Sequence, residues 1–435
     1  IQLQKALNNH RVVYIDNRYI LSNSITIRNR GELRGLKNAA LQAASTRKGL
    51  LNTRGVYILL EGKKRVSISG IRFMPAANMY NMASYGSTVI LLSNSSHCTI
   101  DRNQFDFAFS YSKGMNAVWV TTNSNRNIIS NNFVKTLGIT YCENGSSFNV
   151  VEGNKLINSS FNALGGIGNG DKPCRSNKVL NNYVENAGRM GIEDIQNTSG
   201  TLIKGNVISG TGKIPNLGRG LGMGISAVAK NTTVEKNKVW DAKSYYIEVR
   251  GNSNIKVLDN EIYDKGTERG IYINFVVPSS SALADQGTII RQTKIEGCLK
   301  AIETLGDGVK QIVDIDKNLI VNPVAQGINI DLRGLIRSSI TIRGNRIVFY
   351  HKTNANRQGI VTYTTVKSGH QEYSCVIDGN FISYKPAAKG GSGYDIAMII
   401  QTDHTVVSNN TIDGYPGGLN QGIASNGSTT PRIPF

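Results

Sequence analysis

The chain has 435 residues, of which 40% are hydrophobic, 46 are glycine and only 9 are proline. This composition is typical of a folded, turn-rich β protein and excludes a disordered one. No run of 18 apolar residues occurs, so the sequence predicts no insertion into a membrane. The net charge of +19 indicates either plain solubility or an attraction to polyanions. The basic residues are spread over the chain and form no nucleic-acid-binding motif, so no nucleic acid is expected as partner, and an acidic polysaccharide remains a candidate polyanion.

The first 24 residues are predicted to form an N-terminal cap and a first strand, and a short phrase recurs after them. In order, the phrase consists of an apolar residue, a polar residue, an apolar residue, two small or polar residues, Asn, any one residue and an apolar residue. Its copies centre on Asn103, Asn132, Asn154, Asn182, Asn206, Asn237, Asn260, Asn318, Asn345, Asn380 and Asn410. Weaker copies have Ile71 and Thr293 in place of Asn. The steps between strong copies range from 22 residues (132 to 154) to 35 (345 to 380).

A fixed phrase at this period predicts stacked repeat units, and the apolar alternation around it predicts strands. A single unit cannot bury its own apolar face, whereas a stack of units buries a continuous core. We therefore predict an all-β solenoid of about a dozen coils over residues 25–414. Residues 415–435 leave the repeat and are predicted to form a separate C-terminal segment.

The repeated asparagine has a structural explanation. We expect it at a corner between two short strands, because Asn tolerates the left-handed backbone conformation. In stacked coils, such amides can also hydrogen-bond to one another along the core, so that each buried polar group has a partner. These asparagines are therefore not predicted to be functional.

The cysteines indicate neither a disulfide framework nor a metal site. They are Cys98, Cys142, Cys174, Cys298 and Cys375, an odd number without CxxC or Cys/His ligand spacing. Cys98 and Cys375 each lie five residues before a repeat Asn, a position that should face the core. We therefore predict no bound metal, and no other cofactor is implied.

A second strand precedes each Asn phrase and usually opens with Gly followed by Ile or Val, as at Gly191-Ile192 and Gly270-Ile271. The next residue should point outward, because strand side chains alternate. Aligned in this way, the outward row reads Tyr57, Ile90, Trp119, Cys142, Gly168, Glu193, Ser226, Glu248, Tyr272, Glu303, Asn329, Val361 and Ala397. A second row, two residues further on, includes Arg250, Asn274 and Asp331. Carboxylates, an Arg and aromatic residues thus gather near the middle of the stack.

Long connections fall mostly between the Asn phrase and this second strand, at residues 78–88, 210–224, 350–359 and 385–394. Insertions at one corner of each coil should form walls along one face, and in repeat proteins this is often the binding face.

These repeats resemble right-handed parallel β-helix proteins of the pectate-lyase-like superfamily, and most of all bacteriophage tailspike depolymerases. The opening adds to the likeness, because Ile1-Gln2 with Ala6-Leu7 and then Val12-Val13-Tyr14-Ile15-Asp16 are similar to a capping helix and first coil. The resemblance implies a right-handed parallel β-helix with a short N-terminal capping helix. It also implies a homotrimer, a bacterial surface polysaccharide as partner, and an extracellular location on a virion tail or as a secreted protein.

One departure separates the chain from the calcium-dependent pectate lyases. That family has Trp-Ile or Trp-Val followed by Asp-His, whereas Trp119-Val120 is followed here by Thr121-Thr122. The departure argues against calcium-dependent lyase chemistry and favours the tailspike analogy.

The catalytic candidates are Glu248, Glu193 and Glu303, with Asp194 and Tyr272 beside them. Glu248 lies two coils from each of the other two glutamates in the row, so each pair should have Cα atoms roughly 10 Å apart. Inverting glycosidases need an acid and a base about 6.5–9.5 Å apart, so either pair suits that geometry after side-chain adjustment. Asp194 could serve if its strand bulges. The alternative is that these carboxylates only balance nearby basic residues.

The predicted substrate-binding residues are Arg250, Asn274, Trp119, Arg189, Lys243 and Arg269. Arg250 and Asn274, with Tyr272, could hold a sugar carboxylate, since Arg suits bidentate carboxylate recognition. Trp119 is expected to be exposed and either to stack on a sugar or to fill a subunit contact. Arg189, Lys243 and Arg269 flank the candidate strands and are either substrate contacts or solvated charges.

The sequence therefore favours a depolymerase that hydrolyses an acidic capsular or surface polysaccharide through paired carboxylates. One alternative is a polysaccharide lyase in which Arg250 neutralises the sugar carboxylate and Tyr272 acts as base. Another is a glycan-binding adhesin without catalysis. In a trimer the site could also lie between subunits.

Overall fold

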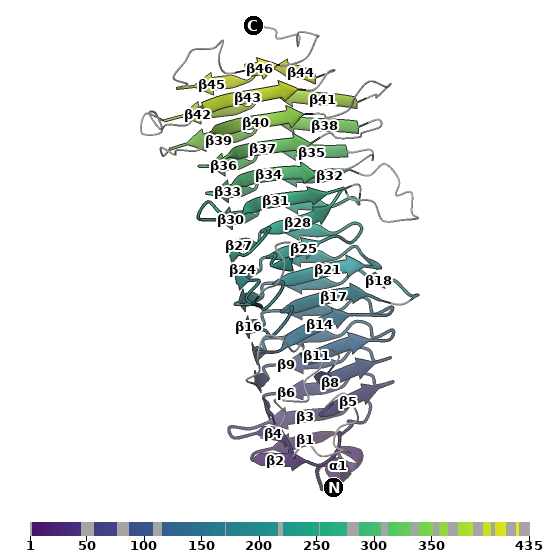
Figure 1. Cartoon of the computed structure of the whole chain (residues 1–435). Helices are drawn as coiled ribbons and strands as arrows, with labels where there is room; N and C mark the ends of the chain where they lie inside the picture. The colour runs from purple at the N-terminus through teal and green to yellow at the C-terminus, as the bar shows by residue number, and fades with distance from the viewer. Residues whose placement is uncertain are drawn as a thin grey trace. The chain divides into compact units, whose positions relative to one another are not determined.

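The computed structural model describes residues 2–44, 56–75, 87–107, 115–169, 171–215, 221–251, 253–275, 287–305, 312–331, 338–350, 356–363, 373–385, 395–401, 405–414 and 423–425. The chain divides into two compact units, Ile1–Ala229 (unit 1) and Lys230–Phe435 (unit 2). Within each unit, parallel strands stack in three sheets, and each turn of the chain adds one strand to each sheet (Figure 1). The predicted parallel β-helix is confirmed.

Unit 1 begins with helix α1 (Gln2–Asn9), which buries Leu7. The Gln4 side chain fixes α1 to the first coil, since it donates to the Thr26 carbonyl at 3.0 Å and accepts from the Thr26 N–H at 2.9 Å. The N-terminal capping helix expected from the resemblance is thus present.

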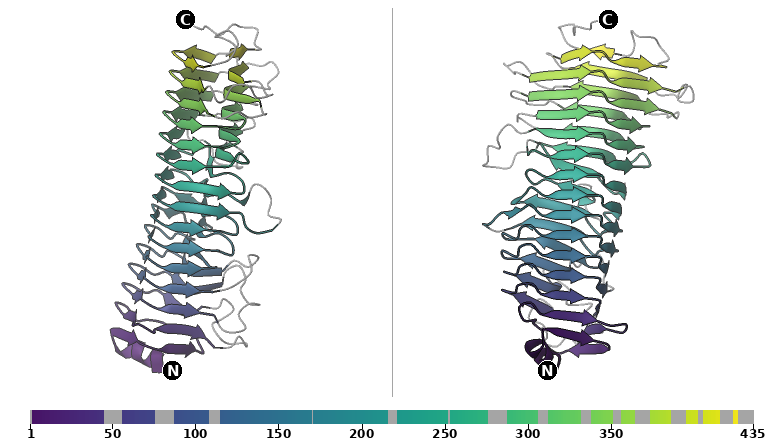
Figure 2. Two further views of the ribbon diagram at one scale, coloured as in Figure 1. Left: turned by 90° about the vertical axis from the view of Figure 1, so that its left-hand side faces the viewer. Right: turned by 180° about the vertical axis from the view of Figure 1, so that it is seen from behind.

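The strands of unit 1 are shown from further sides in Figure 2. Its first sheet contains β1 (Val12–Ile15), β3 (Glu32–Gly35), β6 (Ser67–Ser69), β9 (Thr99–Asp101), β12 (Ile128–Ser130), β15 (Val150–Glu152), β19 (Lys178–Leu180) and β23 (Leu202–Lys204). Its second sheet contains β2 (Arg18–Leu21), β4 (Ala40–Ala43), β7 (Arg72–Met74), β10 (Gln104–Asp106), β13 (Phe133–Lys135), β16 (Lys155–Ile157), β20 (Tyr183–Glu185) and β24 (Val207–Thr211). Its third sheet contains β5 (Ile58–Glu61), β8 (Ser87–Ser93), β11 (Met115–Thr121), β14 (Gly138–Cys142), β17 (Leu164–Gly168), β21 (Ile192–Gln196) and β25 (Ile225–Ala227), and a separate pair is formed by β18 (Cys174–Arg175) and β22 (Thr198–Ser199).

Unit 2 repeats the same arrangement. Its first sheet contains β26 (Thr233–Glu235), β29 (Lys256–Leu258), β32 (Thr288–Arg291), β35 (Ile312–Asp316), β38 (Ser338–Arg343), β41 (Tyr373–Asp378) and β44 (Thr405–Ser408). Its second sheet contains β27 (Lys238–Ala242), β30 (Glu261–Tyr263), β33 (Lys294–Glu296), β36 (Leu319–Val321), β39 (Arg346–Phe349), β42 (Phe381–Tyr384) and β45 (Thr411–Asp413). Its third sheet contains β28 (Ile247–Arg250), β31 (Arg269–Asn274), β34 (Lys300–Leu305), β37 (Gln326–Asp331), β40 (Arg357–Tyr363), β43 (Asp395–Gln401) and β46 (Ile423–Ser425).

Several expectations about chain organisation concern regions that the structure describes only in part. The last strand, β46, pairs with β43 and so adds to the third sheet beyond residue 414. The expected boundaries after residues 24 and 414 stay a prediction. The expected walls stay a prediction too, because residues 76–86, 216–220, 351–355 and 386–394 lie outside the described residues.

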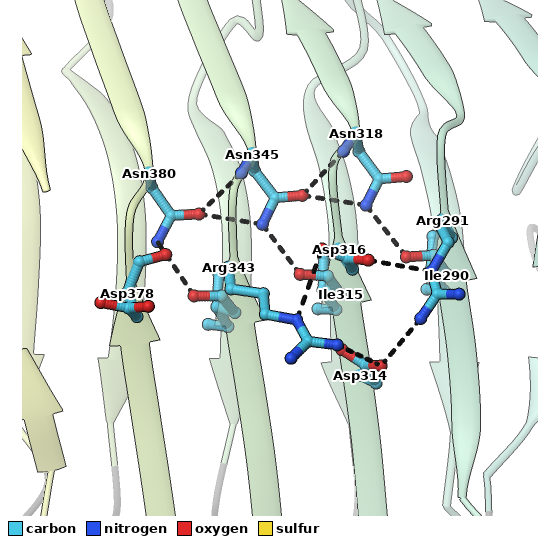
Figure 3. Close-up of polar contacts among 11 residues, drawn as sticks. Ile290, Arg291, Asp314, Ile315, Asp316, Asn318, Arg343, Asn345, Asp378 and Asn380 are labelled. Carbon is cyan, nitrogen blue, oxygen red and sulfur yellow. Dashed lines mark hydrogen bonds and ion pairs between the residues drawn. The ribbon is translucent and has the colours of Figure 1, made fainter. Parts of the chain in front are cut away.

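The repeat asparagines form a buried ladder of amides in each unit. In unit 2, the Asn345 side-chain NH2 donates to the Ile315 carbonyl at 2.9 Å and to Asn380 Oδ1 at 3.0 Å (Figure 3). Its Oδ1 accepts from the Asn318 backbone N–H at 3.0 Å and from the Asn318 side chain at 2.9 Å. Each amide therefore joins neighbouring coils, which confirms the predicted role.

The backbone explanation for the repeated Asn was wrong. The left-handed residue is the one before the ladder Asn, as at Arg102 (φ 51°), Asn181 (φ 52°) and Lys317 (φ 54°). The ladder position is selected for its buried amide instead. Thr293 occupies the same place with a different group, and its hydroxyl oxygen accepts from the Asn260 N–H at 3.3 Å.

A network of ion pairs lies beside the ladder on the first sheet of unit 2 (Figure 3). Asp316, whose side chain is 4% exposed, contacts Arg291 Nε at 2.9 Å and Arg343 Nε at 3.4 Å. Asp314 contacts the same two arginines at 3.4 and 3.6 Å. The network joins three neighbouring strands, β32, β35 and β38, so part of the basic surface charge is used to hold coils together.

The glycine that opens the third-sheet strands marks a close approach between coils. A Cβ on Gly270 would lie 2.4 Å from the Ala301 carbonyl oxygen, and one on Gly359 would lie 2.5 Å from that of Ala397. A side chain at these positions would therefore force neighbouring coils apart. All five cysteines are buried and unbridged. The burial of Cys98 and Cys375 agrees with the expectation that they face the core.

Replacing Asn345 by Leu tests the ladder. The change removes the acceptor of the Asn318 backbone N–H and one acceptor of the Asn318 NH2 group, together with the bonds donated to the Ile315 carbonyl and to Asn380 Oδ1. Each polar group left unsatisfied in this buried environment costs about 1–3 kcal/mol. We expect a loss of about 3–5 kcal/mol in the free energy of unfolding, measured by urea denaturation. Ser339→Ala, at an exposed position on β38, is the control and should change it by less than about 0.5 kcal/mol. Equal effects of the two changes would contradict a structural role for the ladder.

Candidate functional site

The outward row on the third sheet is set by strand register. In unit 1 the residues in register are Leu91, Trp119, Thr140, Gly165, Glu193 and Ser226. In unit 2 they are Glu248, Tyr272, Glu303, Asn329 and Val361. The sequence alignment was therefore right at Trp119 and from Glu193 to Val361.

The same alignment was wrong at Tyr57, Ile90, Cys142, Gly168 and Ala397, because the register places Leu59, Leu91, Thr140, Gly165 and Ile399 in the row. Around Cys142 the pairing is irregular, because the register shifts between Asn116 and Val118 where β11 meets β14, and between Thr140 and Cys142 where β14 meets β17. Cys142 is completely buried as a result. A one-residue slip moves a side chain to the other face of a strand, and the repeat phrase carries no signal for it.

Unit 2 contains Glu248, Tyr272 and Glu303 on three adjacent strands, β28, β31 and β34. Tyr272 lies between the two glutamates in register. The three residues are 9%, 6% and 8% exposed, so the expectation that Glu248 is an exposed strand residue was wrong. Tyr245 contributes to this burial, since its ring stacks on that of Tyr272 with centroids 4.1 Å apart.

Glu303 lies among positive charges. It forms ion pairs with Arg269 and Lys300, and the Asn329 side chain donates to its Oε1 at 3.3 Å. Arg269 also lies over the ring of Tyr245, 5.6 Å from its centroid. A buried carboxylate is tolerated when it is paired in this way, so the ion pairs hold Glu303 in a fixed position.

Glu248 has different surroundings. Asn274, the expected substrate-binding amide, donates to Glu248 Oε1 at 3.4 Å. Arg250 pairs in register with Asn274, two residues beyond Glu248 on the same strand, and is half-buried. Lys243 precedes the strand and is exposed. Arg250 and Asn274 therefore lie beside the pair of glutamates, and Lys243 remains on the surface.

Tyr272 is poorly suited to act as a base. Burial is the main cause that raises its pKa well above the ordinary value, and Tyr245, Glu248 and Glu303 raise it further. The phenol therefore stays protonated at neutral pH, and removal of a proton from substrate by Tyr272 is disfavoured. This weakens the lyase alternative, in which Tyr272 acts as base.

In unit 1, Glu193 is 1% exposed and is paired with Arg189 at 3.0 Å. It also accepts a hydrogen bond from the Asn162 side chain. Arg189 lies over the ring of Phe161, 5.2 Å from its centroid. Glu193 thus orients Arg189 and Asn162. Glu248 belongs to unit 2, so the expected pairing of Glu193 with Glu248 stays a prediction.

Asp194 points into the core of unit 1. It is completely buried and accepts hydrogen bonds from the hydroxyls of Tyr141 and Thr201, both at 3.1 Å. Its strand pairs in continuous register with β17 and β25, so the bulge on which a catalytic role depended does not occur there. Asp194 satisfies buried hydroxyls instead.

Trp119 is half-buried, whereas the sequence suggested that it was exposed. Its indole N–H donates to Glu143 Oε2 at 2.9 Å, and the Thr121 hydroxyl donates to the same oxygen at 2.8 Å. Trp119 and Glu143 line a pocket together with Asn116, Thr140, Phe161 and Asn162.

Sequence analysis missed Glu143, Asn162, Tyr245 and Lys300. The spacing of a basic residue three or four positions before a row glutamate, as in Arg189–Glu193 and Lys300–Glu303, was the signal available.

The described residues contain no cluster of three or more metal-ligating side chains. Among the same residues, the structure has no helix long and apolar enough to cross a membrane.

Replacing Arg189 by Met tests the pairing of Glu193. The change leaves a buried carboxylate without its cation, and we expect a loss of about 3 kcal/mol in the free energy of unfolding, measured by urea denaturation. Lys243→Met removes an exposed positive charge and should change it by less than about 0.5 kcal/mol. The double variant Arg189→Met with Glu193→Leu should recover most of the loss. A single Arg189 variant as stable as the parent would contradict the pairing.

Comparisons with known proteins agree with this architecture. Residues 175–277 match the family described as right handed beta helix region. No curated protein matches the sequence. Among solved structures, the fold is similar to a tailspike protein of the E. coli bacteriophage HK620, solved in complex with a pentasaccharide, at 13% identity over 87% of this chain and 74% of the other, with a TM-score of 0.52.

It is also similar to the catalytic unit of an alpha-1,3-glucanase from Streptomyces thermodiastaticus, at 13% identity over 93% of this chain and 66% of the other, with a TM-score of 0.51. A surface adhesin of Streptococcus pneumoniae aligns over 97% of this chain and 94% of its own, at 11% identity and a TM-score of 0.45. At these identities the likeness concerns the fold. The chain is a right-handed parallel β-helix protein that resembles the bacteriophage tailspikes in fold.

Proposed function

We propose that the chain is a depolymerase that hydrolyses glycosidic bonds in an acidic bacterial surface polysaccharide, with Glu248 and Glu303 as its catalytic pair. The observation that carries the proposal is the placement of two carboxylates on one face, two strands apart, with Tyr272 between them. Two strand spacings separate the Cα atoms by about 10 Å. Glutamate side chains can bring the carboxyl groups into the range of about 6.5–9.5 Å used by inverting glycosidases.

The two glutamates have the unequal environments that an acid and a base require. Glu303 lies between Arg269 and Lys300 and is assigned as the carboxylate that activates water. Glu248 lies beside Asn274 and Tyr272 and is assigned as the acid that protonates the leaving oxygen. The water attacks the anomeric carbon as the bond to the leaving oxygen breaks, so the configuration inverts.

The charge of this face supports an acidic substrate. Arg250 and Lys300 lie on the strands that carry the pair, Arg269 lies on the strand between them, and the chain as a whole has a net charge of +19. Such a surface attracts polyanions from solution. The fold is similar to that of a tailspike solved in complex with a pentasaccharide and to that of a glucanase, and both similarities are consistent with a carbohydrate substrate. A shared fold alone does not specify a function.

Replacing Glu248 by Gln tests the assignment. Removal of a general acid typically lowers the rate by about 10²–10⁴, and we expect this loss in the release of reducing ends from an acidic capsular polysaccharide. Glu303→Gln should be similarly impaired, whereas Glu261→Gln, on the second sheet of the same unit, should keep full activity. Circular dichroism checks that each variant is folded. Full activity of Glu248→Gln and Glu303→Gln would overturn the assignment.

The same assay distinguishes the other functions. New reducing ends accompanied by the ultraviolet absorbance of an unsaturated uronate would indicate a lyase, and retention of the glycan without new ends would indicate an adhesin. Either result would overturn the proposed hydrolysis.

We further propose a homotrimer in an extracellular or virion setting, by analogy with the tailspikes. Light scattering of the purified chain should give about three times the chain mass. A monomer at micromolar concentration would contradict the trimer while leaving the catalytic assignment to the assay above.

A further inference from the structure

The pocket on the third sheet of unit 1 has one aromatic wall and several fixed polar groups. It is lined by Trp119 on β11, Thr140 on β14, Glu143 directly after β14, and Phe161 and Asn162 before β17. Trp119 is half-buried, so part of its indole ring remains accessible. The enclosed part of the pocket measures about 40 Å³, so it can admit only the polar edge of a ligand whose ring rests against Trp119 at the pocket mouth.

The polar groups of the pocket are held in position by hydrogen bonds. Glu143 accepts from the Trp119 indole N–H at 2.9 Å and from the Thr121 hydroxyl at 2.8 Å. Asn162 donates to Glu193 and accepts from the Met190 N–H at 3.3 Å. The ring orientation and the amide plane are therefore fixed before any ligand binds, which lowers the entropic cost of binding.

The hydrogen bonds also determine what the pocket can offer a ligand. Asn116 Oδ1 accepts from the Thr140 hydroxyl at 3.0 Å, and the Asn116 NH2 group has no acceptor among the described residues. Both bonds that the described residues donate to Glu143 go to Oε2, so within this part of the chain Oε1 is available as an acceptor. The pocket thus presents a carboxylate acceptor, an amide donor and an aromatic ring.

The charge of the pocket is opposite to that of the whole chain. Within the part of the chain that the structure describes, Glu143 forms no ion pair, whereas Glu193 is neutralised by Arg189. An uncompensated carboxylate repels a second carboxylate and attracts a cation. The pocket therefore disfavours a uronate, even though the net charge of the chain is +19.

We propose that this pocket binds one sugar ring that carries no carboxylate, either neutral or bearing an amine. One face of a pyranose presents C–H groups that can pack on the Trp119 ring, and its hydroxyl or ammonium groups can donate to Glu143. Binding here does not depend on catalysis by Glu248 and Glu303. If the proposed function is also correct, the natural substrate contains both acidic residues and residues without a carboxylate.

Tryptophan fluorescence gives a direct test, because the chain has only two tryptophans, Trp119 and Trp240. The full chain with Trp240→Phe reports on Trp119 alone, and glucosamine, glucose and glucuronate are titrated separately into the millimolar range. We expect saturable changes with glucosamine and glucose. Glucosamine should bind at least about tenfold more tightly than glucuronate, because of the Glu143 charge.

Two variants in the same background sharpen the test. Gly165 lines the pocket, and a Cβ built on it would meet nothing nearer than 3.9 Å, so Gly165→Leu should fold and fill the space. It should abolish the response to all three sugars. Glu143→Gln keeps an acceptor for Trp119 and Thr121 but removes the charge, so it should retain glucose binding and lose the preference for glucosamine over glucuronate.

Three results would overturn the proposal. The first is the absence of a saturable response to all three sugars. The second is binding of glucuronate as tight as that of glucosamine, and the third is unchanged binding in a folded Gly165→Leu variant. None of these readouts requires cleavage, so failure here is separate from failure of the proposed hydrolysis.

Discussion

The buried amide ladder is the constraint on which the rest of each unit depends. A parallel strand spacing of about 4.8 Å brings one side chain of each coil directly above its counterpart in the next. An Asn at that position can donate to one neighbour and accept from the other, as Asn345 does between Asn318 and Asn380. The same bonds fix the register of the coils, because a slipped coil would leave several buried polar groups without partners.

Once the register is fixed, the outward face of the third sheet becomes a linear array of side chains at regular spacing. This explains how a repetitive scaffold can hold a chemical site without a special loop. Glu248, Tyr272 and Glu303 come from three successive coils, yet their order and spacing follow from the ladder on another part of the coil. The array is also buried, so each charge in it must be neutralised nearby, as Arg269 and Lys300 do for Glu303.

The outward row of the third sheet has a different electrostatic environment in each unit. In unit 2, two basic residues, Arg269 and Lys300, lie beside the single carboxylate of Glu303. In unit 1, the paired Glu193 and Arg189 cancel, and Glu143 leaves a negative pocket beside Trp119. The charge of a single site can therefore differ from the positive net charge of the whole chain. Some of the basic residues, such as Arg291 and Arg343, form ion pairs that join neighbouring coils.

The sequence by itself determined a stacked β solenoid, because a repeated phrase with strand alternation can bury its apolar face only by stacking; the parallel β-helix was what the family resemblance implied. The sequence also determined part of the outward row, since a period of two residues places Glu193 on the outward face of its strand in unit 1, and Glu248, Tyr272 and Glu303 on that of theirs in unit 2. Only the tertiary structure decided the rest. Irregular pairing of β14 replaced Cys142 with Thr140 in the row and brought Glu143 to Trp119. The burial of Glu248 depends on side chains from neighbouring coils, and so do some partners of the other carboxylates, such as Arg269 for Glu303 and Asn162 for Glu193. Such contacts between residues distant in sequence leave no periodic signal in the chain.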